Sequence, residues 1–185
     1  STVYDLGCSQ GAATLAMRRH INCTGVTLVA VDNAQAMIER CRANVASDLS
    51  PTVVDLRCED IQDTPIQNAS LISLNYTLQF IPLAQRDALI AKLYQGMRKE
   101  GALVLSEKIQ FGDENQQATF TQCHHEFKRL NGYSDLEISQ KRQAIENVLI
   151  PERVDDHLQR LKAAGFSQVY CWFQCFNFAS LIAVK

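Results

Sequence analysis

The sequence predicts an α/β fold in which helices cover both faces of a doubly wound, mostly parallel sheet. Short apolar runs alternate with longer segments of helical pattern through the first 107 residues. These runs are continuously apolar, which is typical of strands buried on both faces, whereas half-buried strands alternate apolar with polar residues. A third observation is the turn between Gly7 and Gly11, which separates the first run from a helical segment. Strand, crossover and strand then repeat as parallel sheets require.

The first half of the chain contains five predicted strands and three predicted helices. The strands are expected at 2–6, 27–32, 53–58, 70–76 and 102–107. The helices are expected at 12–20, 34–46 and 83–98. Asn33 precedes the second helix, and its side chain is a candidate for the N-terminal cap.

After Glu107 the pattern changes from apolar runs to polar helical segments. Residues 113–149 are predicted to form two helices separated by Asn131-Gly132, within a helical insertion or lid at 109–153. A last helix at 154–164 ends at Gly165, its predicted C-cap, and a closing antiparallel hairpin of 168–173 and 179–184 follows. We therefore expect a single domain, 1–185, with a seven-stranded sheet.

Composition excludes several classes of function. The chain has 185 residues, of which 46% are hydrophobic and 21% charged, and 18 Lys and Arg against 20 Asp and Glu give a formal charge of −2. This balance argues against a large nucleic-acid footprint, so no direct nucleic-acid partner is expected. No apolar run approaches the ~20 residues of a membrane span, and no signal peptide is evident. A cytoplasmic protein is therefore expected.

The start of the chain is abrupt, because the first strand begins near residue 2. Domains of this type normally carry one or two helices ahead of that strand. We therefore expect that an N-terminal helical segment, part of the ligand lid, precedes the numbered chain.

The cysteines do not indicate a metal or a disulfide framework. Their number, seven, is odd, and no C-x-x-C pair occurs, so reduced and partly buried thiols are expected. The cluster Cys123-His124-His125 is a poor metal site, because adjacent helical residues point about 100° apart. No metal is expected.

The spacing of the acid and the two glycines in the opening turn indicates which class of ligand it binds. The pattern Asp5-x-Gly7-x-x-x-Gly11 is neither G-x-G-x-x-G nor a P-loop. It resembles the first motif of class I S-adenosylmethionine-dependent methyltransferases, which have a Rossmann-like fold. Glycine permits a sharp turn and lets a ligand lie against bare backbone, and the helix that follows presents unpaired N–H groups. S-adenosylmethionine is therefore the expected small-molecule ligand.

Acids at the ends of the second and third strands are candidates for binding the nucleoside. Asp32 ends the second strand and can accept hydrogen bonds from both ribose hydroxyls; the alternative is a helix-capping or solvated acid. Asn33 can contact the ribose or the adenine edge, or only cap the helix. Asp60 can accept from the adenine amine with Ile61 against the ring, or it is a surface acid.

The segment after the fourth strand faces the sulfonium and the second substrate in this fold. Asn75 is a candidate for binding the methionyl part or the transferring group. Tyr76 and Phe80 either flank that group or belong to the core, which is the commoner place for such aromatics. Judged on the residues alone, the pair Lys141-Arg142 reads as solvated surface.

Six stretches together resemble a more specific family, the bacterial carboxy-S-adenosylmethionine synthases. They are 3–9, 36–41, 102–108, 131–134, 136–142 and 172–178. The resemblance runs over essentially the whole chain, and the last three stretches are more specific than the glycine turn.

The resemblance implies an unusual transferase. The family converts the methyl group of S-adenosylmethionine into a carboxymethyl group, takes the carboxyl from prephenate, and leaves phenylpyruvate. The product, carboxy-S-adenosylmethionine, is used by a tRNA carboxymethyltransferase to modify the wobble uridine. Family members are homodimers, and the helical insertion is a candidate interface.

The resemblance also implies roles for particular residues. Arg142 binds the new carboxylate, a task suited to a planar and always charged guanidinium, and Asn75 lies beside the reacting end. The remaining ligand contacts implied are Gly7, Cys8 and Ser9 for the methionyl end, Asp32 and Asn33 for the nucleoside, and Asp60 and Ile61 for adenine. Two alternatives stay open: an ordinary methyltransferase acting on a small molecule or tRNA, and a non-catalytic cofactor-binding scaffold.

Overall fold

The structure, a computed structural model, describes the backbone of residues 1–146 and 148–185 and the side chains of 1–140 and 148–185. The strands are β1 Thr2–Leu6, β2 Thr27–Asp32, β3 Val54–Cys58, β4 Ala69–Asn75, β5 Met97–Lys108, β6 Gln168–Cys175 and β7 Phe178–Val184. The helices are α1 Ala12–His20, α2 Gln35–Ala46, α3 Leu83–Gly96, α4 Glu114–Leu130, α5 Asp135–Glu146 and α6 Val154–Ala163, with a 3₁₀ turn, η1, at Leu78–Phe80.

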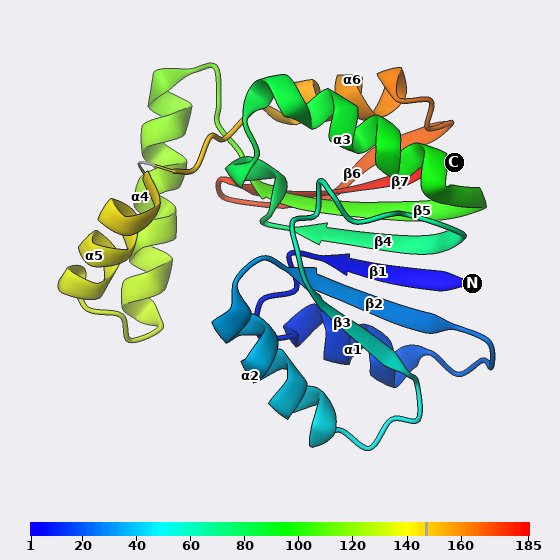
Figure 1. Ribbon diagram of the computed structural model, residues 1–185. Coiled ribbons are helices and arrows are strands. Elements are labelled where there is room, and N and C mark those ends of the chain that lie inside the picture. Colours follow the sequence, from blue (N-terminus) through cyan, green and yellow to red (C-terminus); the bar gives the residue numbers. More distant parts are fainter. Residues whose placement is uncertain (147) are drawn as a thin grey trace.

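The described residues form a seven-stranded sheet in the order β3-β2-β1-β4-β5-β7-β6. Strands β1 to β5 pair in parallel, and β7 is antiparallel to both β5 and β6. The predicted fold class and the closing hairpin are thus confirmed. Strand order reverses between β1 and β4, and ligands of such sheets bind beside the carboxyl ends at this reversal. In Figure 1 the helices α4 and α5 lie at that end, and both termini lie at the other.

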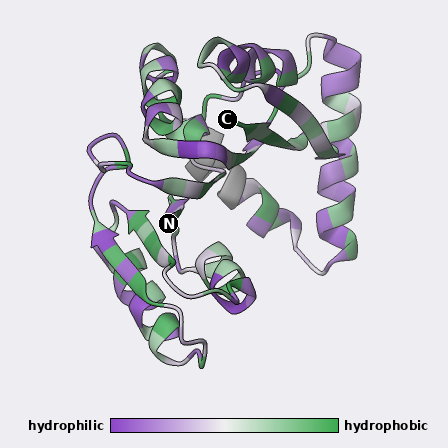
Figure 2. Ribbon diagram, turned by 90° about the vertical axis from the view of Figure 1, so that its right-hand side faces the viewer, coloured by the Kyte–Doolittle hydropathy of each residue, from purple (hydrophilic) through white to green (hydrophobic). Residues whose placement is uncertain are grey.

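Alternate residues of the central strands enter two separate cores. Leu28 and Ala30 of β2 pack in a cluster with Ile38 and Cys41 of α2. Their neighbours in β2 pack in a larger cluster that includes residues of α3 and α6. Figure 1 shows α1 and α2 on one face of the sheet and α3 and α6 on the other, and in Figure 2 strands carry mostly hydrophobic colours. Two-sided burial is the physical reason for the continuous apolar runs.

The helical half also follows the predicted pattern. Two helices, α4 and α5, occupy the expected insertion between β5 and α6. Gly165 follows the C-cap of α6 with φ +110°, and the N–H of Phe166 donates to the Leu161 carbonyl in the manner of a Schellman motif. No helix in the described part of the chain is long and apolar enough to cross a membrane.

Two local predictions are wrong. Asn33 does not cap α2, whose N-cap residue is Ala34; instead the Asp32 Oδ1 accepts from the Ala34 N–H at 2.9 Å. Helix α3 ends at Gly96, two residues earlier than expected, and β5 begins at Met97. A Cβ at position 96 would lie 2.2 Å from the Ile66 carbonyl oxygen, so close backbone packing requires glycine there.

Candidate functional site

The turn between β1 and α1 depends on its two glycines because protein, not ligand, fills the space beside them. Gly7 has φ +81°, and a Cβ there would lie 2.1 Å from the Thr77 Oγ1. Gly11 has φ +88°, and a Cβ there would lie 2.6 Å from the Cys41 Sγ. The prediction that a ligand lies against the backbone of this turn concerns its other side and stays a prediction. The small size of these glycines lets the β4 loop and α2 approach the turn closely.

A buried polar chain connects the opening motif to Asn75. Asp5 is 1% exposed, and its Oδ2 accepts from the Thr14 hydroxyl at 2.5 Å. Burial raises the pKa of the Asp5 carboxyl, while hydrogen bonds from Thr14 and Ser73 act in the opposite direction. The Asn75 Nδ2 donates to the Ser73 Oγ at 2.8 Å. This contact holds the amide of Asn75 at the carboxyl end of β4, beside the turn.

Asp32 ties the turn to the end of β2. Its Oδ2 accepts from the Ser9 N–H at 2.9 Å while its Oδ1 accepts from Ala34. Ser9 is exposed and has φ +48°, a left-handed conformation that the bond to Asp32 stabilises. Each carboxylate oxygen keeps a lone pair for a further donor. Asp32 is thus placed to accept two hydroxyl groups at the edge of the turn, and the exposed Asn33 adjoins it.

Cys8, the middle residue of the turn, faces inward. Its side chain is 5% exposed and belongs to the same core cluster as Cys41. Contact with Cys41, burial and the nearby Asp5 and Asp32 carboxylates raise the pKa of the Cys8 thiol. All seven cysteines are free thiols, and five of them are exposed, so the expectation of partial burial holds for Cys8 and Cys41 only.

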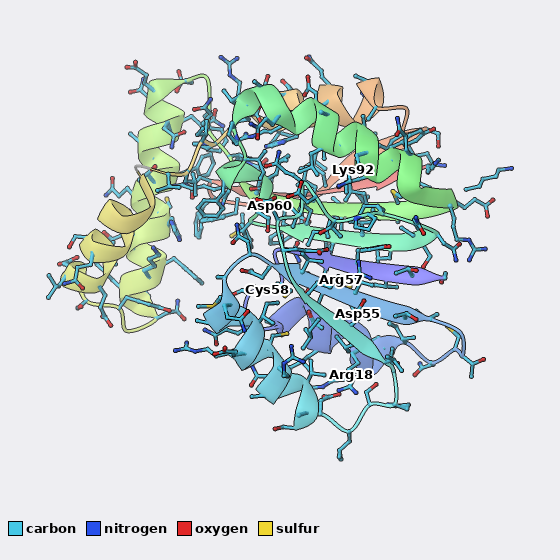
Figure 3. The ribbon with its side chains drawn as sticks, viewed as in Figure 1. Arg18, Asp55, Arg57, Cys58, Asp60 and Lys92 are labelled. Carbon is cyan, nitrogen blue, oxygen red and sulfur yellow. The ribbon has the colours of Figure 1, made fainter. Side chains whose placement is uncertain are left out.

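Asp60 and Ile61 follow β3 at the same edge of the sheet. Figure 3 shows Asp60 beyond Cys58, the last residue of β3. The Asp60 Oδ1 accepts from the Gln62 N–H at 2.8 Å. Ile61 is 6% exposed and packs in the larger core, so little of its side chain reaches the surface.

A buried carboxylate that the sequence analysis missed holds the loop after β4. Glu107, at the end of β5, is 0% exposed and accepts N–H bonds from Thr77, Leu78 and Gln79 at 3.2, 2.9 and 3.2 Å. Burial raises the pKa of Glu107 to about 8, although these donors and Arg86 oppose the rise. An acid that ends an otherwise apolar strand was the available signal in the sequence.

A cavity of about 740 Å³ lies between this loop and α4. Tyr76 and Phe80 line it and are 48% and 45% exposed, so the prediction that they belong to the core is wrong. Tyr76 has φ +53°, an unfavourable conformation for an aromatic residue, and its ring meets that of Phe178 edge-on at 5.9 Å. Tyr76 directly follows Asn75, the last residue of β4, and Lys108, which also lines the cavity, is the last residue of β5.

A buried ion cluster fastens the segment after α5 to the same loop. Arg86 of α3 is 0% exposed and donates to the Glu152 carboxylate and to the carbonyls of Gln79, Ile81 and Ile150. Arg160 of α6 grips the same carboxylate through two bonds of 2.8 and 2.6 Å. Burial alone would raise the pKa of the Glu152 carboxyl, but the bonds from both arginines outweigh it and hold the pKa below its ordinary value.

The structure brings most of the predicted site residues together at one edge of the sheet. The exception is Arg142, whose side chain it does not describe. Residues of the turn, Asp32, Asp60 and Asn75 all lie at the carboxyl ends of neighbouring strands β1 to β4. Arg142 lies in α5, and its side chain is outside the described residues. A second hollow, about 910 Å³, is lined by residues of 19–26 and 47–53 and contains none of the predicted residues. Within the described residues no three His, Cys, Asp or Glu are grouped as metal ligands.

Comparison with solved structures supports the fold. The chain is similar to an O-methyltransferase family 2 protein from Planctomyces limnophilus, with a TM-score of 0.72 and 15% identity over 100% of this chain and 49% of that one. It is also similar to the magnesium protoporphyrin IX methyltransferase of Synechocystis, solved with bound S-adenosylhomocysteine, with a TM-score of 0.68 and 14% identity. That match covers 99% of this chain and 73% of the other.

Comparison of the sequence with known proteins identifies the family more narrowly than comparison of the fold. The family described as "Methyltransferase domain" matches residues 3–101. Proteins named carboxy-S-adenosyl-L-methionine synthase are 55% identical over 185 residues in Pasteurella multocida and 58% identical over 185 residues in Marinobacter nauticus. Both matches cover 100% of this chain, and they cover 77% and 74% of the two relatives. The chain therefore belongs to the carboxy-S-adenosyl-L-methionine synthase family, within the class I methyltransferase superfamily.

Proposed function

We propose that this chain is a carboxy-S-adenosylmethionine synthase, a transferase that converts S-adenosylmethionine and prephenate into carboxy-S-adenosylmethionine and phenylpyruvate. The observation that carries the proposal is identity above 50% to synthases of that name along the whole chain. The product serves a tRNA carboxymethyltransferase that modifies the wobble uridine. The protein itself works in the cytoplasm, without a metal and without binding nucleic acid.

The residues at the carboxyl edge fit S-adenosylmethionine. The turn of Gly7, Cys8 and Ser9 binds the methionyl end through its backbone. Asn75, at the end of β4, binds the same end through its side-chain amide. Asp32, whose two oxygens are held 2.9 Å from backbone N–H donors, accepts the ribose hydroxyls and adjoins Asn33. A pre-positioned carboxylate loses little side-chain entropy when ligand binds, which favours affinity.

Asp60 and Ile61 complete this site on the β3 side, where they hold the adenine. The Asp60 carboxylate is anchored through one oxygen by the Gln62 N–H and keeps its other oxygen for the exocyclic amine. Because Ile61 is largely buried, only a small part of its side chain contacts the adenine ring, and the core holds that part in place.

Arg142 and the helical insertion supply what an ordinary methyl donor site lacks. The sulfonium acidifies the C–H bonds of the adjacent methyl carbon. As the donor becomes phenylpyruvate it releases carbon dioxide and hydroxide; the hydroxide takes a methyl proton and leaves as water, and the resulting ylide carbon bonds to the carbon dioxide. The new carboxylate then needs a cation, and Arg142 of α5 fills that role. Helices α4 and α5 cover the carboxyl edge as a lid, which keeps water from quenching the reactive carbon.

The molecule works as a homodimer. Large apolar side chains are exposed on the edge strand β6 and on the insertion: Leu130 86%, Leu136 65%, Trp172 63% and Phe173 54%. Exposed apolar residues that gather on an edge strand and an adjoining helix are typical of association surfaces.

Turnover of the purified chain tests the proposal. The chain is incubated with S-adenosylmethionine, with and without prephenate, and the nucleosides are separated by liquid chromatography and weighed by mass spectrometry. We expect a product heavier by one carbon dioxide that forms only with prephenate. Formation of S-adenosylhomocysteine with a methylated acceptor would instead favour an ordinary methyltransferase, and binding without any turnover would favour a scaffold.

The assignment of Arg142 has its own test. Arg142→Ala is expected to weaken binding of carboxy-S-adenosylmethionine at least about tenfold more than binding of S-adenosylmethionine, because a bidentate ion pair is lost only with the former. Calorimetric titration with both ligands measures the difference. Equal losses for the two ligands would remove Arg142 from this role.

A further inference from the structure

The 740 Å³ cavity beneath α4 has no role in holding the nucleoside, yet it is built like a small-molecule site. Its walls come from six parts of the chain: the loop after β4, the end of β5, helices α4 and α5, the segment between α5 and α6, and the hairpin between β6 and β7. Its volume falls within the range of about 300–1,000 Å³ found for small-molecule pockets. Through Tyr76 it directly follows Asn75, the residue assigned to the reacting end.

The lysines give the cavity wall a positive charge. Lys108 enters from β5 and Lys128 from α4, which also contributes the imidazoles of His124 and His125. Among the described residues that line it there is no Asp or Glu. Low-dielectric walls lined by cations raise the local concentration of an anionic ligand.

A buried amide in the same wall lacks a partner. Asn177, in the turn between β6 and β7, lines the cavity and is 2% exposed. Its Oδ1 is buried with no hydrogen-bond partner among the described residues. A buried unsatisfied polar group costs about 1–3 kcal/mol, so it needs an explanation, and a bound ligand supplies one.

Aromatic rings form another part of the wall, and one of them lies on a strained backbone. The rings of Tyr76, Phe80 and Phe178 line the cavity, and Phe178 also lies 4.8 Å from the His124 ring. Tyr76 keeps its left-handed backbone with the help of a 2.6 Å bond from its N–H to the Ser106 carbonyl. Strain of this kind persists where the surroundings enforce it, commonly at ligand sites. Aromatic walls with cationic ends match a small ring that carries carboxylates.

We infer that this cavity binds the carboxyl donor, a small cyclic dicarboxylate that carries a hydroxyl group, with Lys108 pairing a carboxylate and the Asn177 Oδ1 accepting a hydrogen bond from that hydroxyl. The inference rests on the proposed function, because that function supplies prephenate as the donor. It adds the place of binding and the residues that select the second substrate. The two substrates then meet at the carboxyl end of β4, with the nucleoside toward β1 and the donor toward β5.

Two variants with matched controls test the inference. Lys108→Gln removes the cation, and Asn177→Asp places a negative charge against the carboxylates with little change of volume. Their controls, Lys99→Gln and Asn115→Asp, make the same changes at exposed positions that do not line the cavity. Steady-state KM for prephenate and the calorimetric Kd for S-adenosylmethionine are measured for all four variants and for the unmodified chain.

We expect KM for prephenate to rise at least about tenfold in both cavity variants, the effect of one charge-assisted contact. The Kd for S-adenosylmethionine should stay within about twofold, and both controls should match the unmodified chain. An unchanged KM in both cavity variants would overturn the inference. So would a parallel loss of S-adenosylmethionine affinity in both, since that pattern indicates a structural role.

Direct binding separates this inference from the proposed function. Prephenate is titrated calorimetrically into the chain loaded with S-adenosylhomocysteine, which does not require turnover. Binding that is lost in both cavity variants supports the inference even if no carboxylated product forms, in which case only the proposed function fails. Absence of prephenate binding, or binding that both variants retain, rejects the cavity as the donor site.

Discussion

At the scale of single residues, Asp32 performs two tasks with one carboxylate. It stabilises the left-handed Ser9 in the turn and it begins the loop into α2, through bonds of 2.9 Å at each oxygen. The free lone pairs face the edge where the nucleoside is proposed to lie. The side chain that shapes the loop is therefore also the one proposed to bind the ribose.

Replacement of Asp32 by alanine is expected to raise the Kd for S-adenosylmethionine at least about tenfold, since hydrogen bonds to a charged group contribute about 1.5–3 kcal/mol. Calorimetric titration measures this. Asp55→Ala is the matched control, because Asp55 lies on β3 and pairs with Arg57 away from the turn. An unchanged affinity in Asp32→Ala would remove Asp32 from the ribose role.

Some of these residue roles were predictable and others were not. The position of Asp32 beside the turn was predictable because an acid that ends a second strand after a glycine turn is a local pattern, whereas its ribose role stays a prediction. Glu107 and Arg86 were missed because their importance comes from partners about 30 and 66 residues away, respectively the η1 backbone and Glu152. The misplacement of Tyr76 and Phe80 has the same origin, since only the position of α4 decides whether a strand-end aromatic meets core or cavity.

At the scale of elements, the ion cluster joins α3, α6 and the segment that returns from α5. Arg86 satisfies the backbone carbonyls of Gln79 and Ile81 near η1 and of Ile150 in the returning segment, as well as the Glu152 carboxylate, so one buried side chain ties the two irregular segments together. Element boundaries were predicted well where the signal is local, as at α1, which matches its expected range of 12–20. They were predicted poorly at Gly96, where α3 ends, because a tertiary contact with Ile66 requires glycine at that position.

The substitution Arg86→Met is expected to lower the free energy of unfolding by about 3–5 kcal/mol, because it leaves Glu152 partly uncompensated and buried carbonyls unsatisfied. Urea denaturation followed by circular dichroism gives this value. Arg98→Met, at an exposed position, should change it by less than about 0.5 kcal/mol. A loss below about 1 kcal/mol in Arg86→Met would contradict the role assigned to the cluster.

At the scale of the whole molecule, a buried histidine contributes stability that is lost in mild acid, whereas Glu107, whose pKa is raised to about 8, contributes in the opposite sense over the same range. His157 of α6 is 1% exposed, and burial lowers its pKa from 6.5 to about 4. Between these two values the unfolded chain binds a proton that the folded chain does not, so acid favours unfolding. The contribution is at most about 3 kcal/mol, from 1.36 kcal/mol per pH unit.

His157→Phe should therefore gain unfolding free energy relative to the unmodified chain as the pH falls from 6.5 to 4, measured by urea denaturation of both proteins at several pH values. His20→Phe, at an exposed position near the end of α1, serves as the control and should keep the pH profile of the unmodified chain. A difference between His157→Phe and the unmodified chain that does not change with pH would contradict the role assigned to His157.

Association is the second property of the whole molecule. Light scattering should give twice the 20.7 kDa mass of one chain. Phe173→Arg, on the edge strand β6, should yield monomers because a charge enters an apolar contact, whereas Leu49→Arg, 100% exposed in the loop after α2, should leave the dimer intact. A dimer that survives Phe173→Arg would place the interface elsewhere.

The central claim is that this chain moves a carboxyl group onto the methyl carbon of S-adenosylmethionine. The most direct test uses prephenate labelled with ¹³C in its ring carboxyl, followed by tandem mass spectrometry of the nucleoside product. The account predicts that the label appears in the carboxymethyl group attached to sulfur. An unlabelled product, or S-adenosylhomocysteine alone, would contradict it.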